Sequence, residues 1–338
     1  MYHCVSRCVR RAYLCGRDSY TGCNYEHRRG WVRDRLKELS AIFGVEIFSY
    51  AVMSNHLHVV LQTRPDRVRM WHDEEVAKRW CRLFRGLMAK RAGKEFDEDK
   101  FEQIRKDRER IGICRRRLGD LSWFMRCLNE SLARRANAED ECGGRFWEGR
   151  FHCQRLMDAG AILACMAYVD LNPVRAGMAS GLEDSRFTSI YDRLVERRAK
   201  QRLSRLGKID NPSRAQEREI CREENRQGQA RWLLQFGAKD SPLSGVDDEY
   251  YTALVEWTGR TIRTDKRGYI PVKLKRVLDR FNLDAEEWAK NVESYGTLFY
   301  RLVGPAEDLM MFAKNRGQRW IRGRSSSEQL YKTEKKAA

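Results

Sequence analysis

Residues 45–62 read VEIFSYAVMSNHLHVVLQ, which is two β-rich runs joined by a short polar break. The runs cover residues 45–52 and 56–62, and Met53-Ser54-Asn55 separates them. Aromatic and β-branched residues favour strands, and a short break between two such runs is typical of a hairpin. The stretch therefore predicts two antiparallel strands.

The segments on either side of this hairpin predict an alternation of strands and helices. Upstream, residues 2–9 form a β-rich run, and apolar side chains recur at helical spacing over residues 27–43, where Gly44 ends the helix. Downstream, we expect one or two solvated helices inserted over the charged residues 65–120, a helix over 121–137 and a strand over 145–156. A helix over 159–171 follows, with Asp158 as N-cap and Asn172-Pro173 as its end. This order predicts an α+β fold, an antiparallel sheet with packed helices.

The character of the chain changes beyond about residue 180. We expect residues 1–180 to form the first domain and residues 181–231, which are dense in charged side chains, to form a linker or exposed helices. Aromatic residues return over 232–322 and predict a small, mainly helical module. Residues 323–338 are rich in Arg, Lys and Ser and predict a disordered tail.

The composition points to a polyanionic partner. The chain carries 66 Lys and Arg against 48 Asp and Glu, a net charge of +18. Neutralising phosphates releases condensed counterions, so nucleic acid is the natural partner. The alternatives are a merely solvated basic surface or a ribosome-associated protein. The first 11 residues lack the apolar core of a signal peptide, and residues 159–169 are too short to span a bilayer. The 11 cysteines are scattered without a CxxC pair, which is typical of reduced thiols in a cytoplasmic protein without membrane contact.

The candidate metal ligands are the two histidines of the hairpin. On a strand, positions i and i+2 point to the same face, so His56 and His58 project together while Leu57 and Val59 point into the core. Two imidazoles on one strand can chelate a divalent ion and leave several coordination positions open. The alternative is a pair of half-buried histidines with no metal.

A tyrosine and an asparagine further along the chain could complete such a site. Tyr168 and Asn172 are four residues apart and lie on one face of the predicted helix. A cation that polarises a phosphate would make attack by a tyrosine feasible, although its pKa is near 10. The Asn172 carbonyl oxygen could complete the protein ligands. Ordinary packing of Tyr168 and a helix-ending role for Asn172 are the alternatives.

Four stretches then carry a family resemblance: YHCVSRCVRR (residues 2–11), YAVMSNHLH (50–58), GRFWEGRF (144–151) and YVDLNPVRAG (168–177). In this order they resemble the REP-associated tyrosine transposases, a branch of the single-tyrosine HUH transposase superfamily, over residues 2–180. The resemblance implies a ferredoxin-like HUH domain. It also implies Mg²⁺ or Mn²⁺ on His56 and His58, Asn172 as third ligand and Tyr168 as the residue that attacks DNA. The insertion at 65–120 departs from compact members, so the tyrosine helix must fold back to the sheet.

The resemblance implies a strand-transfer enzyme that acts on single-stranded or hairpin DNA in a bacterial cytoplasm. Tyr168 would form a 5′-phosphotyrosine link and release a 3′-OH. Candidate DNA-binding residues are the arginines near the sheet: Arg7, Arg10, Arg11, Arg145 and Arg150. Three alternatives remain: a DNA- or RNA-binding regulator without cleavage activity, a phosphodiesterase that hydrolyses without a covalent step, and a structural RNA-binding protein. Relatives of this kind include both dimers and monomers, so a homodimer is also an open expectation.

Overall fold

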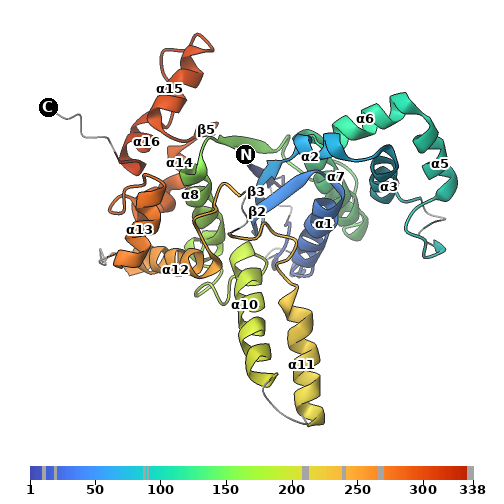
Figure 1. Ribbon diagram of the computed structural model, residues 1–338, viewed down its shortest axis with the longest axis horizontal. Helices are drawn as coiled ribbons and strands as arrows, with labels where there is room; N and C mark the ends of the chain where they lie inside the picture. Colours follow the sequence, from blue (N-terminus) through green and yellow to red (C-terminus); the bar gives the residue numbers. More distant parts are fainter. Residues whose placement is uncertain are drawn as a thin grey trace.

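The structure is a computed structural model, drawn in Figure 1. It describes residues 1–9, 13–18, 21–86, 89, 91–207, 213–237, 241–264 and 270–332.

A five-stranded mixed sheet forms the centre of an α+β fold. Its strands, in the order β2-β3-β1-β4-β5, are β2 (Val45–Val52), β3 (His56–Thr63), β1 (Tyr2–Arg7), β4 (His152–Leu156) and β5 (Leu302–Val303). The first four are antiparallel neighbours, and β5 runs parallel to β4. With α1 (Arg28–Ile42) and α7 (Leu121–Glu139), these four follow the β-α-β-β-α-β order of a ferredoxin-like unit. The predicted hairpin and fold class are thus confirmed.

The sheet is buried on both faces. Successive side chains of β3 point alternately to one face and the other. Leu57 and Val59 belong to an apolar cluster that includes Leu36 of α1 and Phe124 of α7. Val60 belongs to a second cluster on the opposite face. Because side chains alternate, His56 and His58 lie on that second face.

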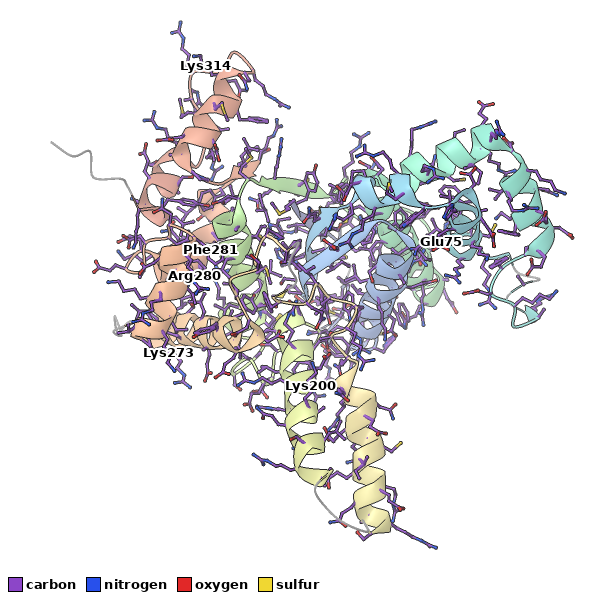
Figure 2. The ribbon with its side chains drawn as sticks, viewed as in Figure 1. Glu75, Lys200, Lys273, Arg280, Phe281 and Lys314 are labelled. Carbon is purple, nitrogen blue, oxygen red and sulfur yellow. The ribbon has the colours of Figure 1, made fainter. Side chains whose placement is uncertain are left out.

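The charged segment 65–120 corrects the sequence prediction of one or two solvated helices. It contains α2 (Pro65–Met70), α3 (Asp73–Leu83), α5 (Glu98–Lys106) and α6 (Arg108–Leu118). One side of this group is packed, since Val76, Ile104 and Cys114 are buried in the first cluster. Charged side chains cover the outer side, for example Glu75 of α3 (Figure 2). A few well-spaced apolar residues therefore suffice to anchor a strongly charged segment.

The second face is covered by α8 (Ala159–Asp170) together with helices from the last third of the chain. These are α12 (Asp248–Thr264), α13 (Val272–Arg280) and α14 (Trp288–Leu298). Tyr251, Trp288 and Tyr295 are buried in the same cluster as the apolar residues of α8. The predicted helical module therefore also completes the first domain, to which it adds both β5 and a packing layer.

Two further predictions are corrected. Residues 145–156 are a strand only over β4, because the preceding residues form no ladder and only Trp147 makes an isolated bridge, to Cys8 just after β1. The predicted disordered tail begins with a helix instead, α16 (Arg324–Leu330), which follows α15 (Ala306–Lys314) and buries Leu330 and then Tyr331.

Residues 181–231, predicted as a linker or exposed helices, include α10 (Ser189–Leu206) and α11 (Arg214–Gln227), which pack on each other and project from the sheet in Figure 1. The first turns of α10 are buried, with Ile190 and Asp192 among the buried residues. Within the described ranges, no helix is both long and apolar enough to cross a membrane. All 11 cysteines are described, and all are free thiols.

Candidate active site

The two histidines of β3 stand next to each other on the face that α8 covers. Their ring centroids are 4.8 Å apart at an interplanar angle of 73°. His58 is buried, whereas His56 is partly exposed near the end of the strand. The same-face projection predicted for an H-x-H on a strand is therefore present.

Tyr168 and Asn172, although more than 100 residues further along the chain, meet this pair. The Tyr168 ring lies edge-on to His58, with ring centroids 5.7 Å apart. The Asn172 amide nitrogen lies 3.0 Å from His58 Nε2. Asn172 begins the short helix α9 (Asn172–Arg175), which continues from α8 after a turn. All four predicted catalytic and metal-ligating residues thus share one site.

Hydrogen bonds at both ends hold α8 in position. Asp158 caps the N-terminus by accepting from the backbone N–H of Ala161 at 2.9 Å. At the other end the buried Asp170 accepts hydrogen bonds from Ser189 Oγ and Tyr251 Oη. Burial raises the pKa of Asp170 to about 6, although the hydrogen bonds from Ser189 and Tyr251 act to lower it. The carboxylate links the tyrosine helix to both α10 and α12 and so limits how far Tyr168 can move.

All three histidines of the site have a lowered pKa. Burial lowers the pKa of His56 to about 4, and Arg7 on the neighbouring strand adds to the effect. Burial also lowers the pKa of His3 to about 4 and that of His58 well below its usual value. These imidazoles are therefore neutral at physiological pH, and a neutral imidazole has the lone pair that a metal ion needs.

The donors present fit a hard or borderline divalent ion. His56 and His58 offer imidazole nitrogens, and the Asn172 amide can offer its oxygen after a half-turn, since its two ends have nearly the same shape. Within the described residues, no group of three or more His, Cys, Asp or Glu side chains is placed to hold a metal ion.

Several site residues were not predicted. His3 of β1 stacks on His58, with ring centroids 5.1 Å apart and an interplanar angle of 12°. The strand register could have indicated it, because Val5 pairs with His58 and His3 shares Val5's face. Tyr295 stacks on Tyr168 at 4.9 Å, and Arg175 lies 4.9 Å from the Tyr168 ring centroid. Nothing local in the sequence marks Tyr295 as a site residue.

Three of the five predicted DNA-binding arginines lie in the described part of the chain. Arg7, Arg145 and Arg150 are exposed, and the loop holding the last two lies beside β1, where the Glu148 N–H donates to the Arg7 carbonyl at 2.9 Å. Arg10 and Arg11 lie outside the described residues. Trp147 of the same loop is buried and donates from Nε1 to the Asn129 carbonyl, so it packs in the core.

A second basic surface adjoins the far edge of the sheet. A groove of about 350 Å³ follows β5 and α15, and its walls include Tyr300, Arg301, Arg316, Arg319 and Trp320. The side chain of Trp320 is 74% exposed, and that of Tyr300 is 54% exposed. No carboxylate is among the described residues that line this groove. We call it the basic aromatic groove.

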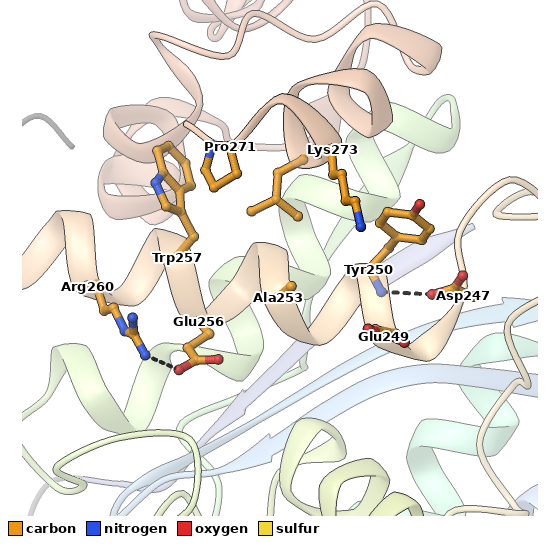
Figure 3. A pocket seen from close by; sticks show the side chains of 10 residues that line it. Asp247, Glu249, Tyr250, Ala253, Glu256, Trp257, Arg260, Pro271 and Lys273 are labelled. Atoms are coloured by element: carbon orange, nitrogen blue, oxygen red, sulfur yellow. Dashed lines mark hydrogen bonds and ion pairs between the residues drawn. The ribbon is translucent and has the colours of Figure 1, made fainter. Parts of the chain in front are cut away.

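A different hollow, shown in Figure 3, lies between α12 and the start of α13. Its volume is about 590 Å³, and Asp247, Glu249 and Glu256 contribute carboxylates to its wall. Glu256 forms an ion pair with Arg260, and Lys273 is close by. A wall of mixed charge does not favour binding of a nucleic-acid backbone, whereas the basic aromatic groove does.

We find no match to this chain among models of protein families, among curated proteins or among solved structures.

Proposed function

We propose that this protein is a metal-dependent DNA strand transferase that cleaves single-stranded DNA through a 5′-phosphotyrosine intermediate, as the resemblance to REP-associated tyrosine transposases implies. One observation carries the proposal: Tyr168 and Asn172 meet the histidine pair from a distant part of the chain. A nucleophile beside neutral metal ligands is the arrangement that phosphoryl transfer to tyrosine needs.

In the proposed reaction, Tyr168 Oη attacks the scissile phosphorus. A bond forms between phosphorus and the tyrosine oxygen, and the bond from phosphorus to the 3′ oxygen breaks. The phenol proton is lost, and the departing 3′ oxygen takes up a proton to become a 3′-OH. The reverse attack by a 3′-OH rejoins DNA without ATP. A divalent ion, Mg²⁺ or Mn²⁺, held by His56, His58 and Asn172 would polarise the phosphate and offset its charge.

The protein's own side chains orient the nucleophile. Tyr295 stacks on the Tyr168 ring and limits its rotation, and Tyr168 remains partly exposed. The Arg175 guanidinium near the ring favours the negative charge that develops on the tyrosine oxygen. Because one chain supplies all of these groups, a single copy holds a complete site, with or without a homodimer.

The strand is proposed to cross the exposed arginines beside β1 and to reach the basic aromatic groove. Arg7, Arg145 and Arg150 would contact phosphates near His56. Exposed Trp320 and Tyr300 would stack on unpaired bases, which present a π-face whatever their sequence. The substrate class is therefore single-stranded DNA or the single-stranded flank of a hairpin, met in the cytoplasm.

The test is adduct formation. Purified full-length protein is incubated with end-labelled hairpin DNA from the flanks of its gene, with Mn²⁺, Mg²⁺ or EDTA, and resolved on a denaturing gel. We expect a metal-dependent protein–DNA adduct that is lost in Tyr168→Phe and in His56→Ala. The matched control is Tyr250→Phe, since Tyr250 is a tyrosine on α12 at the mixed-charge hollow.

The other outcomes favour the other functions. Cleavage that survives Tyr168→Phe without an adduct would identify a hydrolytic phosphodiesterase. Tight binding to every single-stranded substrate with no cleavage would favour a regulator. Equal affinity for RNA that survives loss of both histidines would favour the structural RNA-binding alternative.

A further inference from the structure

We propose that His3 and Gln154 are positioning residues that fix the tautomer of His58, so that its Nε2 carries the lone pair on the side of Asn172. The inference rests on the proposed function in taking His58 as a metal ligand. It adds two residues, one on β1 and one on β4, that nothing in the local sequence assigns to the site.

The two residues join His58 to the end of α14 by hydrogen bonds. His58 Nδ1 and His3 Nε2 are 2.9 Å apart, and His3 Nδ1 and Gln154 Oε1 are 2.7 Å apart. Gln154 Nε2 donates to the backbone carbonyl of Phe299 at 3.1 Å. His3, Gln154 and His58 come from neighbouring strands, and the register of β1 with β3 and β4 places them on one face.

The Phe299 carbonyl fixes which group donates and which accepts in each of these hydrogen bonds. A backbone carbonyl can only accept, so the Gln154 amide must present N–H to Phe299 and its oxygen to His3. His3 Nδ1 must then carry the proton, which leaves His3 Nε2 as an acceptor. His58 Nδ1 must donate to it, and His58 Nε2 remains unprotonated.

The opposite set of donors and acceptors is excluded by the Phe299 carbonyl. If His58 carried its proton on Nε2, then Nδ1 would have to accept from His3, and His3 from Gln154. The Gln154 oxygen would then face the Phe299 carbonyl, which places two acceptors together with no proton between them. At the other end of this hydrogen-bond network, an unprotonated His58 Nε2 can accept from the Asn172 amide, which lies 3.0 Å away.

Stacking and burial make this arrangement stiff. The His3 ring is parallel to the His58 ring within 12° and is buried, so neither imidazole can turn without losing a hydrogen bond away from water. A ligand whose ring orientation and tautomer are set in advance binds a metal ion more tightly. Loss of such outer partners reduces metal affinity by about 10- to 100-fold.

The test begins with the metal-free, full-length protein labelled with ¹⁵N-histidine. Long-range ¹H–¹⁵N correlation spectra report which ring nitrogen carries the proton, and His58→Ala identifies the His58 signals. We expect the Nδ1–H tautomer of His58 in the unmodified protein. In Gln154→Leu and His3→Phe, which keep side-chain bulk, we expect a mixture of tautomers and Mn²⁺ affinity about 10- to 100-fold weaker by titration calorimetry.

The matched control is His152→Phe, an exposed histidine on the same face of β4, which should leave both readouts unchanged. An Nε2–H tautomer in the unmodified protein, or two folded variants with unchanged tautomer and unchanged Mn²⁺ affinity, would overturn the inference. Failure of the proposed function is distinguishable from this result. A protein that forms no adduct, yet shows the Nδ1–H tautomer and Gln154-dependent Mn²⁺ binding, would retain the positioning role and lose the transferase.

Discussion

Replacing Gly296 by alanine should displace Tyr168, the proposed nucleophile, and leave the fold intact. Gly296 lies in α14, and a Cβ atom built there would be 2.8 Å from Tyr168 Oη and 3.5 Å from Cζ. Ordinary contacts of a Cβ atom begin at about 3.4 Å. The difference requires the hydroxyl to move by about 0.6 Å or more, and Tyr295, stacked on the same ring, restricts the directions open to it.

A shift of this size is small for stability and large for catalysis. A misplacement of about 1 Å can cost about 100-fold in rate, so we expect adduct formation to slow by about 10- to 100-fold. The tip of a tyrosine ring can yield, and alanine is favoured over glycine inside a helix by about 1 kcal/mol. The free energy of unfolding should therefore stay the same or rise slightly.

The assay measures the initial rate of adduct formation together with urea unfolding. Gly112→Ala is the matched control, since Gly112 lies inside α6 and an added Cβ would meet only Arg116 Nη1 at 3.6 Å. The Gly112→Ala variant should gain the same helix propensity and keep the full rate of adduct formation. Equal rates in the two variants would refute the reasoning, because Gly296 would then have no part in placing the hydroxyl.

Three further predictions concern the surroundings of the site. Trp320→Ala should weaken binding of single-stranded DNA by about 5- to 150-fold in fluorescence anisotropy, since stacking contributes about 1–3 kcal/mol per base. An unchanged Kd would contradict a DNA path through this groove. Arg175→Gln should slow adduct formation by about 2- to 5-fold, the equivalent of about 0.5–1 kcal/mol, and an unchanged rate would contradict it. Burial raises the pKa of Asp192, so its contribution to stability is present below the unfolded pKa and is lost as pH rises through the folded value. Between pH 4 and 7, the free energy of unfolding measured in urea should fall less with rising pH in Asp192→Asn than in the unmodified protein. Parallel curves for the two proteins would contradict this prediction.

The parts of the fold that could be predicted are those with a strong local period. The hairpin of β2 and β3, the helix α1 and the N-cap of α8 at Asp158 each follow from a short pattern. The helices over 65–120 were underestimated, because their buried residues are few and separated by charged ones. The helix α16 was missed since Leu330 and Tyr331 are buried by distant segments, which no local composition shows.

The candidate site also contains residues that local periodicity predicts and residues that only tertiary packing brings together. His56 and His58 share one strand, and Tyr168 and Asn172 are separated by about one helical turn, so local periodicity places each pair on one face. That the two pairs meet, and that His3 joins them, depends on strand pairing and helix packing over more than 50 residues. Tyr295 and Gly296 approach the nucleophile from another region of the chain and have no local signal.

The parallel contact between β4 and β5 also has a consequence for how the protein is made. Synthesis proceeds from the N-terminus, so the histidines and Tyr168 leave the ribosome long before Tyr295, Phe299 and β5 do. Until those residues arrive, β4 has a free edge, Gln154 lacks its carbonyl partner and the tyrosine ring is uncovered. A nascent chain thus has Tyr168 and both histidines before it has the residues that align them, which would delay the proposed cleavage at least until β5 has been synthesised.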